Sequence, residues 1–335
     1  MKVFYSPAHH IHDPQSEFTS SGPIPYPECA RRASEIANTL AADPAFVLTI
    51  PEPLDPTVLN TIHDEGFLHF LAQIYAGIAP HSAELTPTTF PLRGRGQRPP
   101  TLRAQAGYYG FDTTPLTPGS WGAALAAASA ASAGATCLLN GATAAYALCR
   151  PPGHHAGRDY FGGYCYLNNA ALAAATLAAH GRVAILDIDY HQGNGTQDIF
   201  YDSDRALFVS IHADPAYQYP LYWGYVDETG TGAGQGLTCN FPLPAATDDS
   251  GYLSTLDQAL TTIAAYDPAF LVLSAGLDLY TQDPLGDWLV SLDGIGGIGE
   301  RIRHIRKPTL IVQEGGYCLE KLGAAARALL DAFIC

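Results

Sequence analysis

The sequence predicts an α/β protein with a parallel sheet that is covered by helices on both faces. Four short and almost entirely apolar runs occur in the second half of the chain, at residues 182–186, 206–211, 270–274 and 309–312. Helix-like stretches alternate with these runs, as at residues 168–180 and 251–266. Strands that are apolar throughout are typical of sheets buried on both faces, and their alternation with helices favours a parallel sheet. Because ligands bind beyond the carboxyl ends of such strands, we expect the functional residues directly after these runs.

The N-terminal third is predicted to combine a strand, helices and two long loops. The alternating pattern of residues 1–6 indicates a strand. Residues 12–27 are rich in proline and predict a long loop, and the basic residues 92–101 predict another. Helices are expected at residues 28–40 and 63–75, the second with a regular apolar face.

The alanine-rich residues 121–148 form the most apolar stretch of the chain. We interpret them as one or two buried helices, because alanine contributes little transfer free energy and polar residues interrupt the stretch. A membrane span is therefore not expected.

The composition favours one compact domain over residues 1–335. Hydrophobic residues make up 47 % of the 335 residues and charged residues only 15 %. The net charge of −15 is a poor match for nucleic acid, whose phosphates require a cationic surface, but it permits a cationic substrate. The seven cysteines form no CxxC pattern, and the polar N-terminal residues do not resemble a signal peptide. We therefore expect a cytoplasmic protein without disulfides.

The strongest local motif follows the apolar run at residues 182–186. Alternation along an extended chain predicts that Asp187, Asp189 and His191 lie on one side. Two carboxylates and an imidazole on one face favour a bound divalent cation, and this mixture of ligands suits zinc. The alternative is a strand end with solvated aspartates and a structural histidine.

A second motif, residues 150–157, contains adjacent histidines on a loop rich in proline and glycine. His154 or His155 could act as a base near neutral pH. Adjacent histidines also occur without such a role, and we interpret the similar pair His9 and His10 as structural.

Two further polar residues follow the last two apolar runs. Asp278 comes after residues 270–274, and Tyr317 comes after residues 309–312 and a pair of glycines. Asp189, His191 and Asp278 would provide three metal ligands and leave positions open for water and substrate. A histidine would transfer protons, and Tyr317 would donate to the oxyanion that develops on a carbonyl. These groups together predict metal-assisted hydrolysis of an amide or a related acyl bond.

The same segments resemble the zinc-dependent histone deacetylase superfamily. In chain order they are RPPGHHAG, GYCYLNNAA, DIDYHQGNGTQDIFY, SAGLD and EGGY. In the N-terminal third, SEFTSSG, FPLRGRG and GYYGFDTTPLTPGSW are similar to the bacterial acetylpolyamine amidohydrolase branch. The resemblance covers nearly the whole chain. It implies the arginase/deacetylase fold, a three-layer α-β-α arrangement with about eight parallel strands.

The resemblance also implies roles for individual residues. Matched to the family motifs, the zinc ligands would be Asp189, His191 and Asp278, and the tandem pair His154 and His155 would include the general base, His155. Tyr317 would stabilise the oxyanion, Asp187 would orient His154, and Asn194 would stand beside His155. A structural potassium ion would be held by Asp187, Ser210 and the carbonyl of Ile211.

The substrate tunnel is implied by the same comparison. Gly163, Tyr164 and Tyr219 would form its wall. The acetylpolyamine enzymes resembled here carry a glutamate near the FDTTP segment, which this chain lacks, so Asp112 or Glu17 would supply the acidic rim. The long N-terminal loop, residues 12–30, resembles a dimer element that narrows the tunnel.

These inferences lead to one main functional prediction with alternatives. The main prediction is a deacetylase with one Zn²⁺ and a structural K⁺ per chain, acting on small cationic acetylated amines, with acetylpolyamines ahead of acetyl-lysine proteins. We expect a homodimer or a higher homo-oligomer, and neither nucleic acid nor membrane as a partner. A non-catalytic module that binds acetylated ligands is the alternative from a different class, and an arginase-like enzyme with two metals is a third option.

Overall fold

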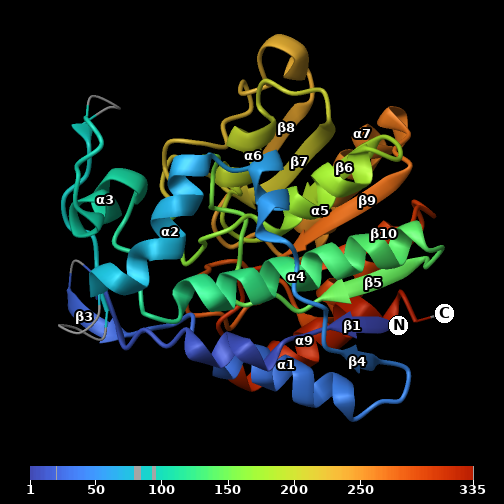
Figure 1. Cartoon of the computed structure of the whole chain (residues 1–335). Coiled ribbons are helices and arrows are strands. Elements are labelled where there is room, and N and C mark those ends of the chain that lie inside the picture. The colour runs from blue at the N-terminus through green and yellow to red at the C-terminus, as the bar shows by residue number, and fades with distance from the viewer. Residues whose placement is uncertain (20, 79–83, 93–95, 335) are drawn as a thin grey trace.

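An eight-stranded sheet lies at the centre of the computed structural model, which describes residues 1–19, 21–78, 84–92 and 96–334 (Figure 1). All neighbouring strands of this sheet run parallel. The strands in spatial order are β4 (Val47–Thr49), β1 (Lys2–Phe4), β5 (Ala144–Ala147), β10 (Thr309–Gln313), β9 (Phe270–Ala275), β6 (Val183–Asp187), β7 (Ala206–Ala213) and β8 (Thr238–Leu243).

Helices cover both faces of the sheet and bury a separate hydrophobic cluster on each. One face carries α2 (Glu65–Ile78), α3 (Leu102–Tyr109), α4 (Ser120–Leu139), α5 (Asn169–Ala178) and α6 (Asn194–Phe200). The other carries α1 (Arg31–Ala41), α7 (Asp249–Tyr266), α8 (Leu292–Arg303) and α9 (Leu319–Asp331). The predicted fold class, a three-layer α-β-α arrangement around a parallel sheet, is confirmed.

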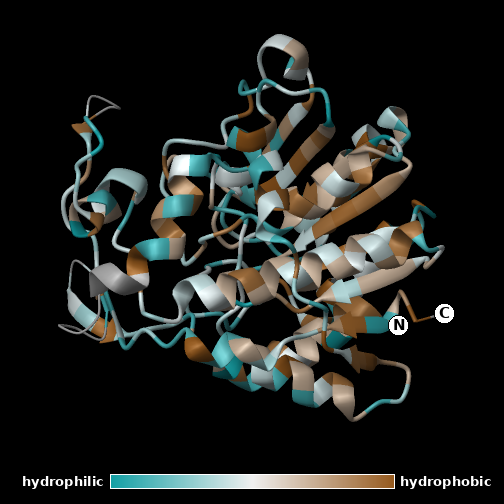
Figure 2. Ribbon diagram, viewed as in Figure 1, coloured by the Kyte–Doolittle hydropathy of each residue, from teal (hydrophilic) through white to brown (hydrophobic). Residues whose placement is uncertain are grey.

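The central strands show why this sequence forms such a sheet. In β6, Val183 and Ile185 join the cluster on one face, whereas Ala184 and Leu186 join the cluster on the other. Side chains alternate between the two faces, so a strand covered on both sides must be apolar at every position. Figure 2 shows this as hydrophobic colouring along the inner strands. Burying each large aliphatic side chain contributes about 1.5–3 kcal/mol.

Two predictions of local structure were wrong. The second part of residues 121–148 is not helical, because α4 ends at Leu139 and the chain turns at Gly141, where φ is +92°, into strand β5. The alanines of β5 are poor strand formers, but their small size lets α4 pack closely on the strand. Residues 12–27 are not a simple loop, because they include an antiparallel hairpin of β2 (Ser16–Thr19) and β3 (Gly22–Pro25).

The described residues also include three short 3₁₀ helices: η1 (Pro7–Ile11), η2 (Pro56–Thr61) and η4 (Gly232–Gly234). Within the predicted basic loop at residues 92–101, positions 93–95 lie outside the described residues. The six cysteines among the described residues are all free. Helix α4 is long and apolar enough to cross a membrane by length and composition, and 56 % of its most apolar window is buried inside the fold.

Candidate active site

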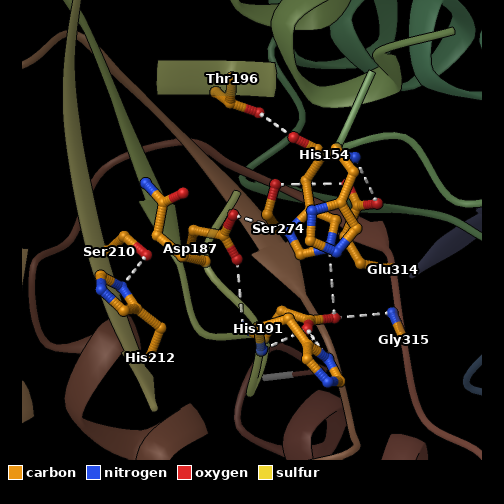
Figure 3. A network of polar contacts seen from close by, with 12 residues as sticks. His154, Asp187, His191, Thr196, Ser210, His212, Ser274, Glu314 and Gly315 are labelled. Carbon is orange, nitrogen blue, oxygen red and sulfur yellow. Dashed lines mark hydrogen bonds and ion pairs between the residues drawn. The ribbon is translucent and has the colours of Figure 1, made fainter. Parts of the chain in front are cut away.

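The predicted functional residues meet where the sheet strands end. His154 and His155 follow β5, Asp187 closes β6, and Tyr317 follows β10. Asp278 follows β9. Since β5, β10, β9 and β6 are parallel neighbours, their carboxyl ends lie at one edge of the sheet. Figure 3 shows several of these side chains and the hydrogen bonds that join them.

Asp189, His191 and Asp278 form a compact group of potential metal ligands. One ligand atom from each lies within 4.8 Å of the others. His191 Nδ1 is 3.1 Å from Asp278 Oδ2 and 3.4 Å from Asp189 Oδ1. Both carboxylates are fully buried, and burial together with the Asp189 charge raises the pKa of Asp278 to about 7. Two ionised carboxylates buried this close together repel each other unless a cation lies between them. The three side chains therefore fit a divalent cation.

Backbone N–H groups fix the two carboxylates. Asp189 Oδ2 accepts a hydrogen bond of 2.8 Å from Gly315, and Asp278 Oδ1 accepts one of 3.0 Å from Tyr190. A Cβ atom added to Gly276 would lie 2.0 Å from Asp189 Oδ2, so only glycine leaves room for this carboxylate. Such contacts orient metal ligands before the metal binds.

The tandem histidines have different surroundings. His154 Nδ1 is 3.0 Å from Asp187 Oδ2, whereas His155 Nδ1 is 2.7 Å from the side-chain oxygen of Asn194. Burial opposes the charged form of His154, but the carboxylates of Asp189 and Asp187 outweigh it and raise the pKa to about 10. Burial and the neighbouring histidines hold the pKa of His155 well below its usual value. His154 therefore favours the imidazolium form, and His155 stays neutral with Nε2 available as an acceptor.

Tyr317 is held in place by contacts of its backbone and its ring. Asp283 Oδ2 accepts the backbone N–H of Tyr317 at 2.6 Å and that of Cys318 at 2.9 Å. The Tyr317 ring packs edge-on against Tyr164, with 5.8 Å between ring centroids. Burial raises the pKa of the Tyr317 phenol well above 10, so the hydroxyl keeps its proton at neutral pH and can donate it in a hydrogen bond.

A cavity of about 210 Å³ joins these groups. Its wall includes His155, His191, Tyr317 and the predicted tunnel residues Gly163, Tyr164 and Tyr219. The Tyr219 ring stands edge-on to the His155 ring at 5.1 Å. At Gly163, with φ of +54°, an added Cβ would lie 2.3 Å from the His155 ring, so this position requires glycine.

The cavity also includes both predicted rim carboxylates, but they are bound differently. Asp112 accepts three hydrogen bonds: Oδ2 accepts from Gly163 N at 2.7 Å and Tyr219 Oη at 2.8 Å, and Oδ1 accepts from Thr114 N at 2.9 Å. Glu17 Oε2 accepts from Tyr164 Oη at 2.7 Å. Its Oε1 has no hydrogen-bond donor among the described residues, so Glu17 has the freer carboxylate.

The residues predicted to hold potassium lie beside the histidine pair. Asp187 and Ser210 are buried register partners on β6 and β7, and Ile211 follows Ser210. Ser210 Oγ is 2.7 Å from His212 Nδ1, and Asp187 Oδ1 accepts the backbone N–H of Asp189 at 3.1 Å (Figure 3).

Glu314 is the first residue of the EGGY motif, and the sequence predicted no role for it. Glu314 Oε2 accepts the N–H groups of Gly153 at 2.6 Å and His154 at 3.1 Å, and Oε1 accepts from Ser274. Its position after a buried strand and before two glycines was the available signal. By contrast, the interpretation of His9 as structural agrees with its burial and its 2.9 Å contact with Tyr5 Oη.

A parallel α/β sheet with a buried set of histidine and aspartate ligands at its carboxyl edge defines a candidate metal-dependent hydrolase. The model of the histone deacetylase domain matches residues 26–333, and the chain belongs to this family. It is 42 % identical over 341 residues to acetylpolyamine amidohydrolase 1 of Pseudomonas aeruginosa, covering 99 % of each chain. The crystal structure of the acetylpolyamine aminohydrolase of Burkholderia pseudomallei superposes with a TM-score of 0.93 at 37 % identity, covering 99 % of this chain and 98 % of that one. Histone deacetylase 8 of Arabidopsis thaliana is 38 % identical over 229 residues, which cover 64 % of this chain and 60 % of the relative.

Proposed function

We propose that this chain is a zinc-dependent deacetylase that hydrolyses N-acetylated amines, with acetylpolyamines as the main substrates. The observation that carries the proposal is that His191 of the ligand group lines one cavity together with His155, Tyr317 and two carboxylates, Glu17 and Asp112. Asp189, His191 and Asp278 would hold the zinc. When bound there, zinc supplies Lewis acidity that polarises the acetyl carbonyl and lowers the pKa of water.

The other groups would move protons and stabilise charge. His155 Nε2 accepts a proton from the attacking water, the C–N bond breaks, and the same imidazolium returns the proton to the leaving amine. Tyr317 donates a hydrogen bond to the carbonyl oxygen as negative charge develops on it. Asp187 keeps His154 in the imidazolium form next to His155, and Asn194 orients the His155 ring. The products are acetate and a free amine.

Three observations support a small cationic substrate. Two of the relatives covered almost end to end are named for acetylpolyamines, whereas histone deacetylase 8 of Arabidopsis matches a smaller part of the chain. Glu17 and Asp112 place negative charge at the cavity, where it attracts an ammonium group. The cavity is also small, which favours a slender amine. An acetyl-lysine protein is the alternative substrate.

Further proposals concern the state of the chain. We take residues 1–335 as one catalytic domain, with K⁺ bound by Asp187, Ser210 and the Ile211 carbonyl. Homodimerisation through the N-terminal hairpin is supported by two exposed apolar side chains, Phe18 at 54 % and Ile24 at 37 % exposure. A cytoplasmic location is consistent with the free cysteines.

Steady-state rates with two substrates test the proposal. We expect the zinc-loaded protein to deacetylate N-acetylputrescine with a higher kcat/KM than an acetyl-lysine peptide. Activity on the peptide alone would contradict the polyamine preference. Tight binding of both substrates without turnover would instead favour a non-catalytic binding module.

A further inference from the structure

A buried carboxylate connects the two segments that carry the proton donor and the base. Glu28 precedes α1 and is fully buried. Its Oε1 atom accepts hydrogen bonds from Arg32 Nη1 at 2.7 Å and from Arg150 Nε at 3.0 Å. Both arginines are buried as well. Because buried charges persist only where they are paired and hydrogen-bonded, Glu28 holds both guanidinium groups in place.

Arg32 extends this contact to the segment of Tyr317. Its Nε donates to the carbonyl of Gly316 at 2.5 Å, and its Nη2 donates to the carbonyl of Glu314 at 2.7 Å. The same guanidinium lies over the Tyr317 ring, with Cζ 4.6 Å from the ring centroid. One side chain therefore holds the backbone before Tyr317 and covers a face of its ring.

Arg150 makes the matching connection to the histidine segment. It lies in the loop that leads from β5, which ends at Ala147, to His154 and His155. Its Nη2 donates to the backbone carbonyl of Glu28 at 2.8 Å, in addition to the bond from Nε to the Glu28 carboxylate. The Glu28 carboxylate thus accepts hydrogen bonds from Arg32, which holds the segment before Tyr317, and from Arg150, which precedes the tandem histidines.

We propose that Glu28 is a positioning residue. It acts through Arg32 to hold the Tyr317 hydroxyl at the correct position relative to the tandem histidines. Glu28 is not among the residues that line the cavity. A hydrogen-bond donor stabilises an oxyanion only at the correct distance, and a displacement of about 1 Å costs on the order of 100-fold in rate. This inference rests on the proposed deacetylase function and on the role of Tyr317 in it.

A double-mutant cycle tests the proposal. The kcat and KM for N-acetylputrescine are measured for zinc-loaded wild type, Glu28→Gln, Tyr317→Phe and the double variant. If Glu28 acts through Tyr317, Glu28→Gln lowers kcat by about 10- to 100-fold with little change in KM in the wild-type background. In the Tyr317→Phe background, the same substitution changes kcat by less than about threefold, because the hydroxyl that it misplaces is already absent.

Asp249→Asn provides a matched control. Asp249 is likewise a hydrogen-bonded carboxylate that does not line the cavity, and it accepts from the backbone N–H and the hydroxyl of Ser291. This control is expected to leave kcat unchanged in both backgrounds. If Glu28→Gln lowers kcat by the same factor in both backgrounds, Glu28 serves the fold alone and the proposal is overturned.

Arg32→Lys repeats the cycle if Glu28→Gln does not fold. Lysine keeps a charge beside Glu28, but one ammonium group cannot also hold both carbonyls and cover the ring. We again expect a large loss of kcat in the wild-type background and a small one in the Tyr317→Phe background. An equal loss of kcat in both backgrounds would overturn the positioning role. No turnover by the zinc-loaded wild type would overturn the proposed function, whereas turnover with equal factors overturns only the positioning role.

Discussion

The hydroxyl of Tyr164 donates a hydrogen bond of 2.7 Å to Glu17, which ties a wall residue of the cavity to a carboxylate of the N-terminal hairpin. The second oxygen of Glu17 remains available for a ligand. Because attraction between this carboxylate and an ammonium group depends on charge, Glu17→Gln should raise the KM for N-acetylputrescine about 3- to 10-fold. The KM for N-butylacetamide, a neutral substrate of similar length, should stay the same. An equal increase for both substrates would indicate an altered cavity shape instead.

Asp112 is expected to behave differently. Its carboxylate accepts hydrogen bonds from Gly163, Tyr219 and Thr114, so it holds the wall of the cavity. In Asp112→Asn, an amide NH₂ would face at least one of these donors. We expect kcat/KM to fall by at least about tenfold, and by a similar factor for charged and neutral substrates. A loss confined to the charged substrate would show that Asp112 recognises the ammonium group.

Tyr317→Phe removes the proposed oxyanion donor without removing the ring. Loss of one such donor typically lowers kcat by about 10²–10³-fold, and KM should change little because the hydrogen bond forms fully only in the transition state. The zinc content, measured by atomic absorption, should remain at one ion per chain. An unchanged kcat in the zinc-loaded variant would exclude this role.

The effect of zinc on stability should depend on pH. Burial and Asp189 raise the pKa of Asp278 to about 7 in the metal-free protein, above its unfolded value near 4. Between these values the folded state binds more protons than the unfolded state. The free energy of unfolding of the metal-free protein therefore falls as pH rises toward 7. Zinc binds the ionised carboxylate, so the rise in Tm on adding zinc should be larger at pH 8 than at pH 6. The reverse order in a thermal unfolding series would contradict this assignment.

Much of the site was predictable because its residues follow buried strands directly. Asp187, Asp189 and His191 end one apolar run, and Asp278 and Tyr317 follow two others. In a parallel sheet such positions meet at one edge, so separate local signals in the sequence converge in space. The family resemblance then gave each residue a role.

The supporting shell was not predictable in the same way. Glu28, Arg32 and Arg150 are charged, and charged residues are usually expected at the surface. Each of these charges is buried only because the others pair with it. Glu28 and Arg32 are also far from Arg150 in the sequence, so no local pattern joins the three. Strand β5 was missed for a related reason, because its alanines suit the strand only when α4 packs closely against it.

The central claim is tested most directly by reconstituting the metal-free protein with zinc. Acetate and free amine released from N-acetylputrescine are measured as zinc is added. We predict no activity without metal, equal amounts of the two products, and a rate that saturates at one zinc per chain. Full activity of the metal-free protein, or no hydrolysis of any acetylated amine at saturating zinc, would contradict the account.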